Sequence, residues 1–277
     1  SRVNRRALIQ ELAKIRGVNY LKGKKWTTNG HPLKMAEIKS DLAEMKRMGI
    51  NQIKYYGMNF HDDNILSVAK EQKLNVTFSF WLPGYNDLIS KTKQLHTLSN
   101  KIIDQVASLK ENDEVVMWNI GNTPLSDFSK HYHQPDAYSL RNDYLKWLSD
   151  LVARIKAVDP HRPVTVDLNV DKFTDMNIDI LSDKIPQIDA YGLIYGKNSK
   201  SYVKTLAVPI FYSHINVDNY VDNSSITPGV FISNWQDETT SDYVFLDGMK
   251  DQYGLTKPAY HLFENKVLGR SLPDDFP

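Results

Sequence analysis

The 277-residue sequence contains no cysteine, which excludes disulfide bonds and thiol catalysis and leaves the compartment open. An excess of charge is also missing. The formal net charge is +1, whereas nucleic-acid-binding proteins typically carry a basic excess or patch. No apolar run approaches the roughly 20 residues of a membrane-spanning helix, and the first residues lack the pattern of a signal peptide. We therefore expect neither a nucleic-acid partner nor a membrane span.

Apolar and aromatic residues are plentiful. The hydrophobic share of 41% is enough for a large core. Aromatic residues make up 11% of the chain, including 15 tyrosines and 5 tryptophans. That content suits a sugar-binding cleft, although a large core also uses such residues. The chain begins and ends abruptly, and we expect it to be a domain excised from a longer polypeptide.

Apolar runs alternate with helical patterns along the whole chain. In Met35–Met48, for example, Ile38, Leu42 and Met45 recur at helical spacing, and Gly49 follows as the expected helix stop. Such alternation predicts βα units around a parallel sheet. We expect strands at Ile15–Leu21, Ile50–Tyr56, Asn75–Trp81, Val115–Ile120, Pro163–Leu168, Ile188–Ile194, Val208–Tyr212 and Gly229–Ser233. We expect helices at Met35–Met48, Asp62–Gln72, Leu88–Leu109, Tyr138–Val158, Phe173–Ile185, Ser201–Leu206 and Pro258–Val267.

Eight strands with interleaved helices predict a single (β/α)8 TIM barrel over residues 1–277. No internal repeat or low-complexity linker interrupts the series. A doubly wound open sheet is the alternative fold. It is disfavoured because no glycine-rich dinucleotide or phosphate motif follows any of the expected strands.

Four segments carry a resemblance to a known family. They are Gly17–Tyr20 (GVNY), Asp41–Tyr56 (DLAEMKRMGINQIKYY), Trp118–Thr123 (WNIGNT) and the stretch from Asp247 to Tyr260. In their order and spacing they resemble the catalytic barrels of retaining β-glycosidases, close to the β-galactosidase/β-glucuronidase and β-glucanosyltransferase types. The resemblance covers nearly the whole chain and implies the same barrel fold.

Retaining glycosidases use two carboxyl groups about 5–5.5 Å apart, one as nucleophile and one as acid/base. The resemblance implies that these groups stand at the ends of strands four and seven. The matching residues are Thr123 at the acid/base position and His214 at the nucleophile position. A threonine hydroxyl without an adjacent base is a poor acid and a poor nucleophile, and a stable glycosyl ester needs a carboxylate. We therefore predict that no catalytic residue is intact.

Residues that bind the sugar are implied by the same resemblance. Asn122 matches the residue that bonds the sugar 2-hydroxyl, and Trp235 matches the aromatic floor of the cleft. Tyr195 matches the tyrosine beside the nucleophile, with Tyr191 as the alternative register. Asn122 capping its turn and Trp235 packing in the core remain open as simpler roles.

Three further residues are candidates for the same cleft. Lys54 stands where the family has an arginine beside the nucleophile. The lysine ammonium carries the same charge but lacks the planar guanidinium that can form two parallel hydrogen bonds with a carboxylate. Trp81 and Tyr56 end neighbouring strands on one face and are predicted to stack on sugar rings. Trp118 lies in the middle of a strand and is predicted to be core.

Other polar groups offer alternatives. His131 and His133 have spacing compatible with a metal, and Asp127 and Asp136 are nearby, but no third ligand is specified. We therefore predict no metal and no cofactor. Asp127, Asp237 or Glu238 is an alternative position for a displaced catalytic acid, because these residues follow strands four and eight.

The leading hypothesis is a catalytically degenerate glycoside-hydrolase-like domain that binds or guides a β-linked glucan or related oligosaccharide. A polysaccharide synthase domain in the same polypeptide is the expected partner, and a location outside the cytoplasm is favoured. The first alternative is an active retaining glycosidase or transglycosylase that uses non-standard carboxylates. The second is an interaction scaffold that has also lost sugar binding.

Overall fold

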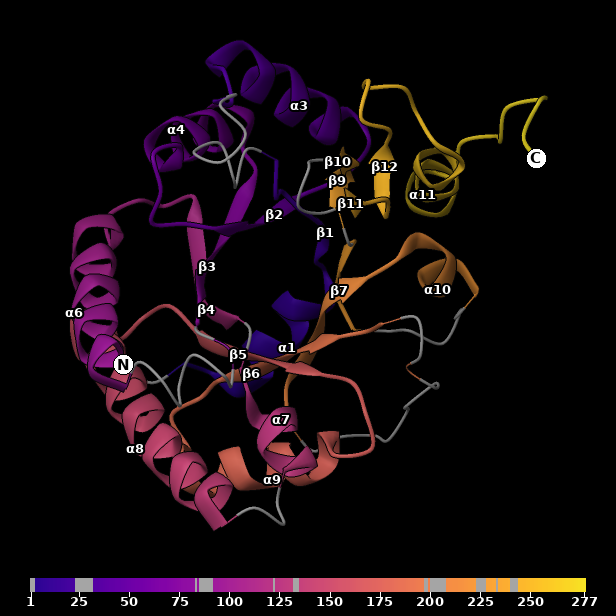
Figure 1. Cartoon of the computed structure of the whole chain (residues 1–277). Helices are drawn as coiled ribbons and strands as arrows, with labels where there is room; N and C mark the ends of the chain where they lie inside the picture. The colour runs from indigo at the N-terminus through magenta and orange to yellow at the C-terminus, as the bar shows by residue number, and fades with distance from the viewer. Residues whose placement is uncertain are drawn as a thin grey trace.

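A closed barrel of eight parallel strands forms the centre of the molecule (Figure 1). The strands follow one another in chain order until β8 pairs with β1. The prediction of a (β/α)8 barrel is confirmed. The strands are β1 (Arg16–Asn19), β2 (Gln52–Tyr56), β3 (Asn75–Trp81), β4 (Val115–Gly121), β5 (Val164–Asn169), β6 (Ala190–Ile194), β7 (Ile210–Ile215) and β8 (Val230–Ile232). The computed structural model describes residues 3–22, 32–82, 84, 92–121, 123–131, 135–196, 199, 208–222, 228–232, 234–239 and 244–277.

Helices surround the barrel (Figure 1), and most of them match helices expected from the sequence, whereas α1, α7 and α10 were not expected. α8 begins at Pro135 rather than at Tyr138, because proline is well suited to the first turn of a helix. The predicted helical turn at residues 201–206 lies outside the described residues. The helices are α1 (Arg5–Ala13), α3 (Met35–Arg47), α4 (Asp62–Gln72), α6 (Thr92–Leu109), α7 (Leu125–Lys130), α8 (Pro135–Val158), α9 (Thr174–Lys184), α10 (Val217–Asp222) and α11 (Pro258–Leu268).

The main core lies between the outside of the barrel and these helices. The predicted stripe of α3 is buried there, and Gly49 ends the helix with a positive φ of 86°. Trp118 points outward from β4 into this core, and its Nε1 donates a hydrogen bond to Asp159 Oδ2 at 2.9 Å. The prediction that Trp118 is a core residue is confirmed.

A second, smaller core lies inside the barrel at the N-terminal ends of the strands. Phe211 and Phe231 point inward there and pack with Leu8 and Leu12 of α1. The sequence carries the signal for this helix, since Leu8 and Leu12 are four residues apart and the Asn4 side chain caps the helix by accepting from Ala7 N–H. Sequence analysis missed α1, which closes this end of the barrel.

Beyond β8, the chain forms two small sheets beside α11 (Figure 1). These sheets were also missed, because strands of two or three residues leave no measurable alternation. Within the described part of the chain, no helix is both long and apolar enough to span a membrane. The strands of the small sheets are β9 (Asn234–Gln236) with β12 (Gly248–Lys250), and β10 (Glu238–Thr239) with β11 (Val244–Phe245).

Candidate functional site

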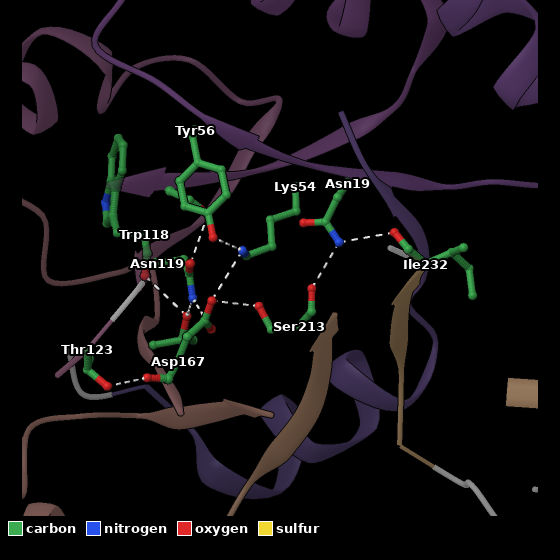
Figure 2. A network of polar contacts seen from close by, with 11 residues as sticks. Asn19, Lys54, Tyr56, Trp118, Asn119, Thr123, Asp167, Ser213 and Ile232 are labelled. Atoms are coloured by element: carbon green, nitrogen blue, oxygen red, sulfur yellow. Dashed lines mark hydrogen bonds and ion pairs between the residues drawn. The ribbon is translucent and has the colours of Figure 1, made fainter. Parts of the chain in front are cut away.

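A buried ion pair occupies the interior of the barrel above the apolar layer. Lys54 Nζ, from β2, lies 3.1 Å from Asp167 Oδ2 on β5, and the two side chains are 1% and 0% exposed (Figure 2). Ser213 Oγ donates to the same carboxylate oxygen at 2.7 Å, and Asn119 Nδ2 donates to the other oxygen at 2.8 Å. Asp167 is therefore held from three other strands, as a buried carboxylate requires.

Hydrogen bonds extend this network around the barrel. Asn119 Oδ1 accepts from Ser79 Oγ at 2.8 Å, which brings in β3. Asn19 Nδ2, on β1, donates to the backbone carbonyls of Ser213 and Ile232, each at 3.0 Å (Figure 2). Side chains and backbone from seven of the eight strands thus meet in one polar layer.

β6 lets the other side chains of this layer approach its backbone closely, because it carries a glycine, Gly192, at this level. A Cβ atom on Gly192 would lie 2.2 Å from Asp167 Oδ1 and 2.9 Å from Phe211 Cζ. Glycine is therefore required on β6 opposite the carboxylate, because a larger residue would displace Asp167.

The charge state of Lys54 follows from this arrangement. Burial lowers the pKa of Lys54, but the Asp167 carboxylate and the Tyr56 hydroxyl outweigh it and hold the pKa above its usual value. The amine is therefore an ammonium and not a nucleophile. It is too deeply buried to contact a ligand directly, contrary to its predicted place in the cleft, because Asp167 draws it into the barrel.

Thr123 follows β4 and is buried. Its Oγ1 donates a 2.7 Å hydrogen bond to the backbone carbonyl of Asp167 (Figure 2). The hydroxyl hydrogen is directed into the barrel wall, so Thr123 ties the ends of β4 and β5 together. Asn122, predicted to bond a sugar hydroxyl, lies outside the described residues.

His214 lies within β7 rather than beyond its end. The sequence placed the end of this strand at Tyr212, but β7 continues through an irregular register with β6, in which Ile194 pairs with His214. His214 Nε2 lies 3.3 Å from Asp247 Oδ2, and the two side chains are 32% and 33% exposed. Asn234 Nδ2 donates to the other carboxylate oxygen at 2.7 Å. The imidazole is thus oriented by a carboxylate at the C-terminal end of the barrel.

Trp235 does not form the exposed aromatic floor of a sugar-binding cleft. It is 1% exposed and packs against Tyr260 of α11, with 6.2 Å between ring centroids. Lys250 Nζ lies 5.5 Å from its ring. The prediction is corrected: β9 pairs with β12 beside α11, and the indole is covered from that side, so no ring face is left for a sugar.

Trp81 and Tyr56 meet at the C-terminal ends of β3 and β2. Their ring centroids are 5.2 Å apart with an interplanar angle of 77°, and Trp81 is 51% exposed. Tyr195, after β6, is half-buried and edge-on to Tyr212 at 6.4 Å. The structure brings Trp81 and Tyr56 into contact and leaves about half of the Trp81 surface exposed.

The alternative acids have different surroundings. Asp237 is buried, accepts from Gly248 N–H at 2.8 Å and pairs with Lys257 at 2.9 Å, so it anchors the small sheets. Asp127 and Glu238 are partly exposed. His131 Nδ1 lies 2.9 Å from the Asp127 backbone carbonyl, not from its carboxylate.

The family model for glycosyl hydrolases family 2, TIM barrel domain, matches residues 3–236. This chain belongs to that family. No curated protein matches it significantly in sequence.

Solved structures share this barrel fold at low sequence identity. A β-glucuronidase from Bacteroides uniformis has a TM-score of 0.71 at 14% identity, over 92% of this chain and 35% of that one. A β-galacturonidase from Eisenbergiella tayi, bound to galacturonate, has a TM-score of 0.69 at 15% identity, over 94% and 52%. A β-galactosidase from Marinomonas ef1 has a TM-score of 0.60 at 8% identity, over 91% and 58%. These likenesses support the fold, and the chain spans only about a third to three fifths of each relative.

Sequence analysis of this family 2 barrel missed Asp167, which lies at the centre of the polar layer. A signal was present, since Thr165, Asp167 and Asn169 alternate with the apolar residues of β5. In a barrel strand, alternate residues face the interior, so polar residues at that spacing predict a polar interior. The pattern does not show which side chain pairs with which.

Proposed function

We propose that this family 2 barrel is a catalytically degenerate domain that binds a β-linked glucan or a related oligosaccharide. One observation carries the proposal: the carboxylate inside the barrel, Asp167, is fully buried and held by Lys54, Asn119 and Ser213. A carboxylate engaged in this way is neither a nucleophile nor a proton donor for a substrate at the mouth. Thr123 and His214 stand where the family resemblance implies the two catalytic carboxyl groups.

Trp81 supports sugar binding. Its half-exposed indole stands at the C-terminal end of β3, the face on which TIM barrels bind their substrates. A β-linked glucosyl ring presents C–H groups on its faces, and these pack well on an aromatic plane. The exposed face of Trp81 is therefore suited to stacking on one sugar unit of a longer chain.

Activity measurements test the catalytic part of the proposal. We expect no product when the protein is incubated with aryl β-glycosides, β-glucan oligomers, or glucuronide and galacturonide substrates. Turnover that disappears in an Asp127→Asn, Asp237→Asn or Glu238→Gln variant would contradict the proposal and support an active enzyme with displaced carboxylates.

Calorimetric titration with a panel of β-glucan oligosaccharides tests the binding part. Trp81→Ala is expected to weaken binding by about 1–3 kcal/mol, by analogy with aromatic stacking elsewhere. The matched control is Tyr253→Ala, an exposed aromatic residue in the loop between β12 and α11, which should leave binding unchanged. A flat titration of the wild-type protein across the panel would favour the scaffold alternative.

One observation favours a second candidate function. Asp247 is a partly exposed carboxylate in contact with His214 at the end of β7, so it is the candidate carboxylate for glycosidase or transglycosylase chemistry at this end of the barrel. Incubation with a 2-fluorosugar followed by mass spectrometry distinguishes the two functions. A covalent adduct, lost in Asp247→Asn, would establish this candidate and exclude a degenerate site.

A polymer ligand implies a partner that makes or presents it. We propose a polysaccharide synthase domain in the same polypeptide, for which the barrel would guide the product. Crosslinking of the full polypeptide during synthesis should join nascent glycan to the barrel in the wild type and much less in Trp81→Ala.

A further inference from the structure

Tyr56 connects the buried ion pair to the exposed indole. Lys54 Nζ donates a 2.7 Å hydrogen bond to the Tyr56 hydroxyl, and it also lies 4.3 Å from the centroid of the tyrosine ring (Figure 2). The same ring also contacts Trp81 in an edge-to-face arrangement. Burial raises the pKa of Tyr56, against the opposing effect of Lys54, so the hydroxyl stays neutral and accepts from the ammonium.

The position of the tyrosine ring is also determined by β4. A Cβ atom on Gly121 would lie 2.8 Å from Tyr56 Cε1 and 3.0 Å from its hydroxyl oxygen. The ring therefore packs directly against the backbone of β4 at Gly121, which pairs with Trp81 in the sheet. Two constraints, the backbone at one side and the ammonium at the hydroxyl, hold Tyr56 in one orientation.

The Tyr56 ring contributes to the orientation of Trp81 through an edge-to-face contact with 5.2 Å between ring centroids. Half of the Trp81 surface is exposed, so its orientation depends on the contacts that remain, and the edge-to-face contact with Tyr56 is one of them. An aromatic surface that is already ordered binds with less loss of side-chain entropy than one that must be ordered by the ligand.

We propose that Lys54 is a positioning residue for glycan binding: it orients the Tyr56 ring, which in turn holds Trp81 in the orientation that stacks on a sugar. This inference rests on the proposed function. It assigns the buried ion pair a role beyond stability, because Asp167 keeps the Lys54 ammonium where it meets the Tyr56 hydroxyl. Lys54 itself does not touch the ligand.

Tyr56→Phe is the most direct test, because it keeps the ring and removes the oxygen that Lys54 contacts. We expect the dissociation constant for a β-glucan oligosaccharide to rise by about three- to tenfold, the cost of ordering one side chain. In a Trp81→Ala background, the same substitution should have no further effect on the residual binding. An equal effect in both backgrounds would overturn the proposal, because Tyr56 would then act without Trp81.

A spectroscopic measurement separates this inference from the proposed function. The near-UV circular dichroism difference between wild type and Trp81→Ala reports the ordered indole without any ligand, and Tyr56→Phe should reduce that difference. Lys54→Met should reduce it too if the variant folds. The matched control is Tyr191→Phe, which removes another buried tyrosine hydroxyl, bonded to Ser182 on the outer side of β6, and should change neither signal nor binding.

The outcomes are distinct. Absence of glycan binding in the wild type would contradict the proposed function, while a reduced indole signal in Tyr56→Phe would still support the coupling. Wild-type binding that depends on Trp81 but not on the Tyr56 hydroxyl would leave the proposed function in place and overturn the positioning role of Lys54.

Discussion

The Lys54–Asp167 ion pair lies at the centre of the buried polar layer, so its removal should change the stability of the barrel. Asp167→Asn leaves the Lys54 ammonium buried without its counter-charge, at a cost expected to be about 3–5 kcal/mol in the free energy of unfolding. Urea denaturation measures this change. A loss below about 1 kcal/mol, the usual value of an exposed pair, would mean that the pair is not isolated from water.

A double-mutant comparison tests whether the loss in Asp167→Asn comes from the unpaired charge of Lys54. Lys54→Met combined with Asp167→Asn removes both charges, so the double variant should be more stable than Asp167→Asn alone. If the losses of the two single variants simply add, the charges do not interact and the network must be stabilised by its neutral hydrogen bonds.

Asp159 predicts a dependence of stability on pH. Burial opposes ionisation of Asp159, but hydrogen bonds from Arg162 and Trp118 outweigh it and hold the pKa below its usual value. The folded pKa is thus lower than the unfolded pKa of about 3.9. The stabilisation is complete above that pH and is lost as the pH falls through the folded pKa.

Asp159→Asn should therefore lower the free energy of unfolding by about 1–3 kcal/mol at pH 7 and by less at pH 2.5. Urea denaturation at the two pH values measures both changes. Asp183→Asn, at an exposed position on α9, is the control and should change neither value. An equal loss at both pH values would contradict the role of the carboxylate charge.

The strand β6 packs closely against its neighbours because Gly192 has no side chain. Gly192→Ala adds a methyl group 2.2 Å from Asp167 Oδ1, and we expect a loss of about 1–3 kcal/mol from overpacking. Gly196→Ala is the matched control, because among the described residues its Cβ would meet only Ser199 Oγ, at 3.9 Å. Thermal melting that shows equal effects at both sites would contradict the tight contact.

The α1 helix gives a second prediction at this scale. Leu12 is buried under the barrel with Phe211 and Phe231, so Leu12→Ala should cost about 2–5 kcal/mol. Ile9, on the same helix, is 48% exposed, and Ile9→Ala should have little effect on urea denaturation. Equal losses would mean that α1 does not close the barrel in solution.

Elements were predictable where one face of the segment is uniformly apolar. The ranges of α4 and β3 match the expected ranges to the residue, since each has a clear period and a turn at its end. β7 was placed too early because the polar pair Ser213 and His214 interrupts the apolar run. In a polar barrel interior, such a pair continues a strand instead of ending it.

For the whole molecule, closure of the barrel by β1 and β8 predicts one cooperative unit. Residues distant in sequence are joined there, as in the pairing of Gly17 with Phe231. We expect tryptophan fluorescence, which senses both Trp118 and Trp235, and far-UV circular dichroism to give the same urea midpoint. Two separate midpoints would contradict the prediction of a single domain over residues 1–277.

The sequence by itself determined the barrel, its strand order and the identity of the residues at the candidate catalytic positions, because periodicity and motif spacing are properties of the chain. Only the tertiary structure decided that Lys54 pairs with Asp167, that Trp235 is covered and that Trp81 is open. Those outcomes depend on which side chains from distant strands meet in the closed barrel and on how much water they exclude. The local spacing of residues encodes neither these contacts nor the extent to which water is excluded from them.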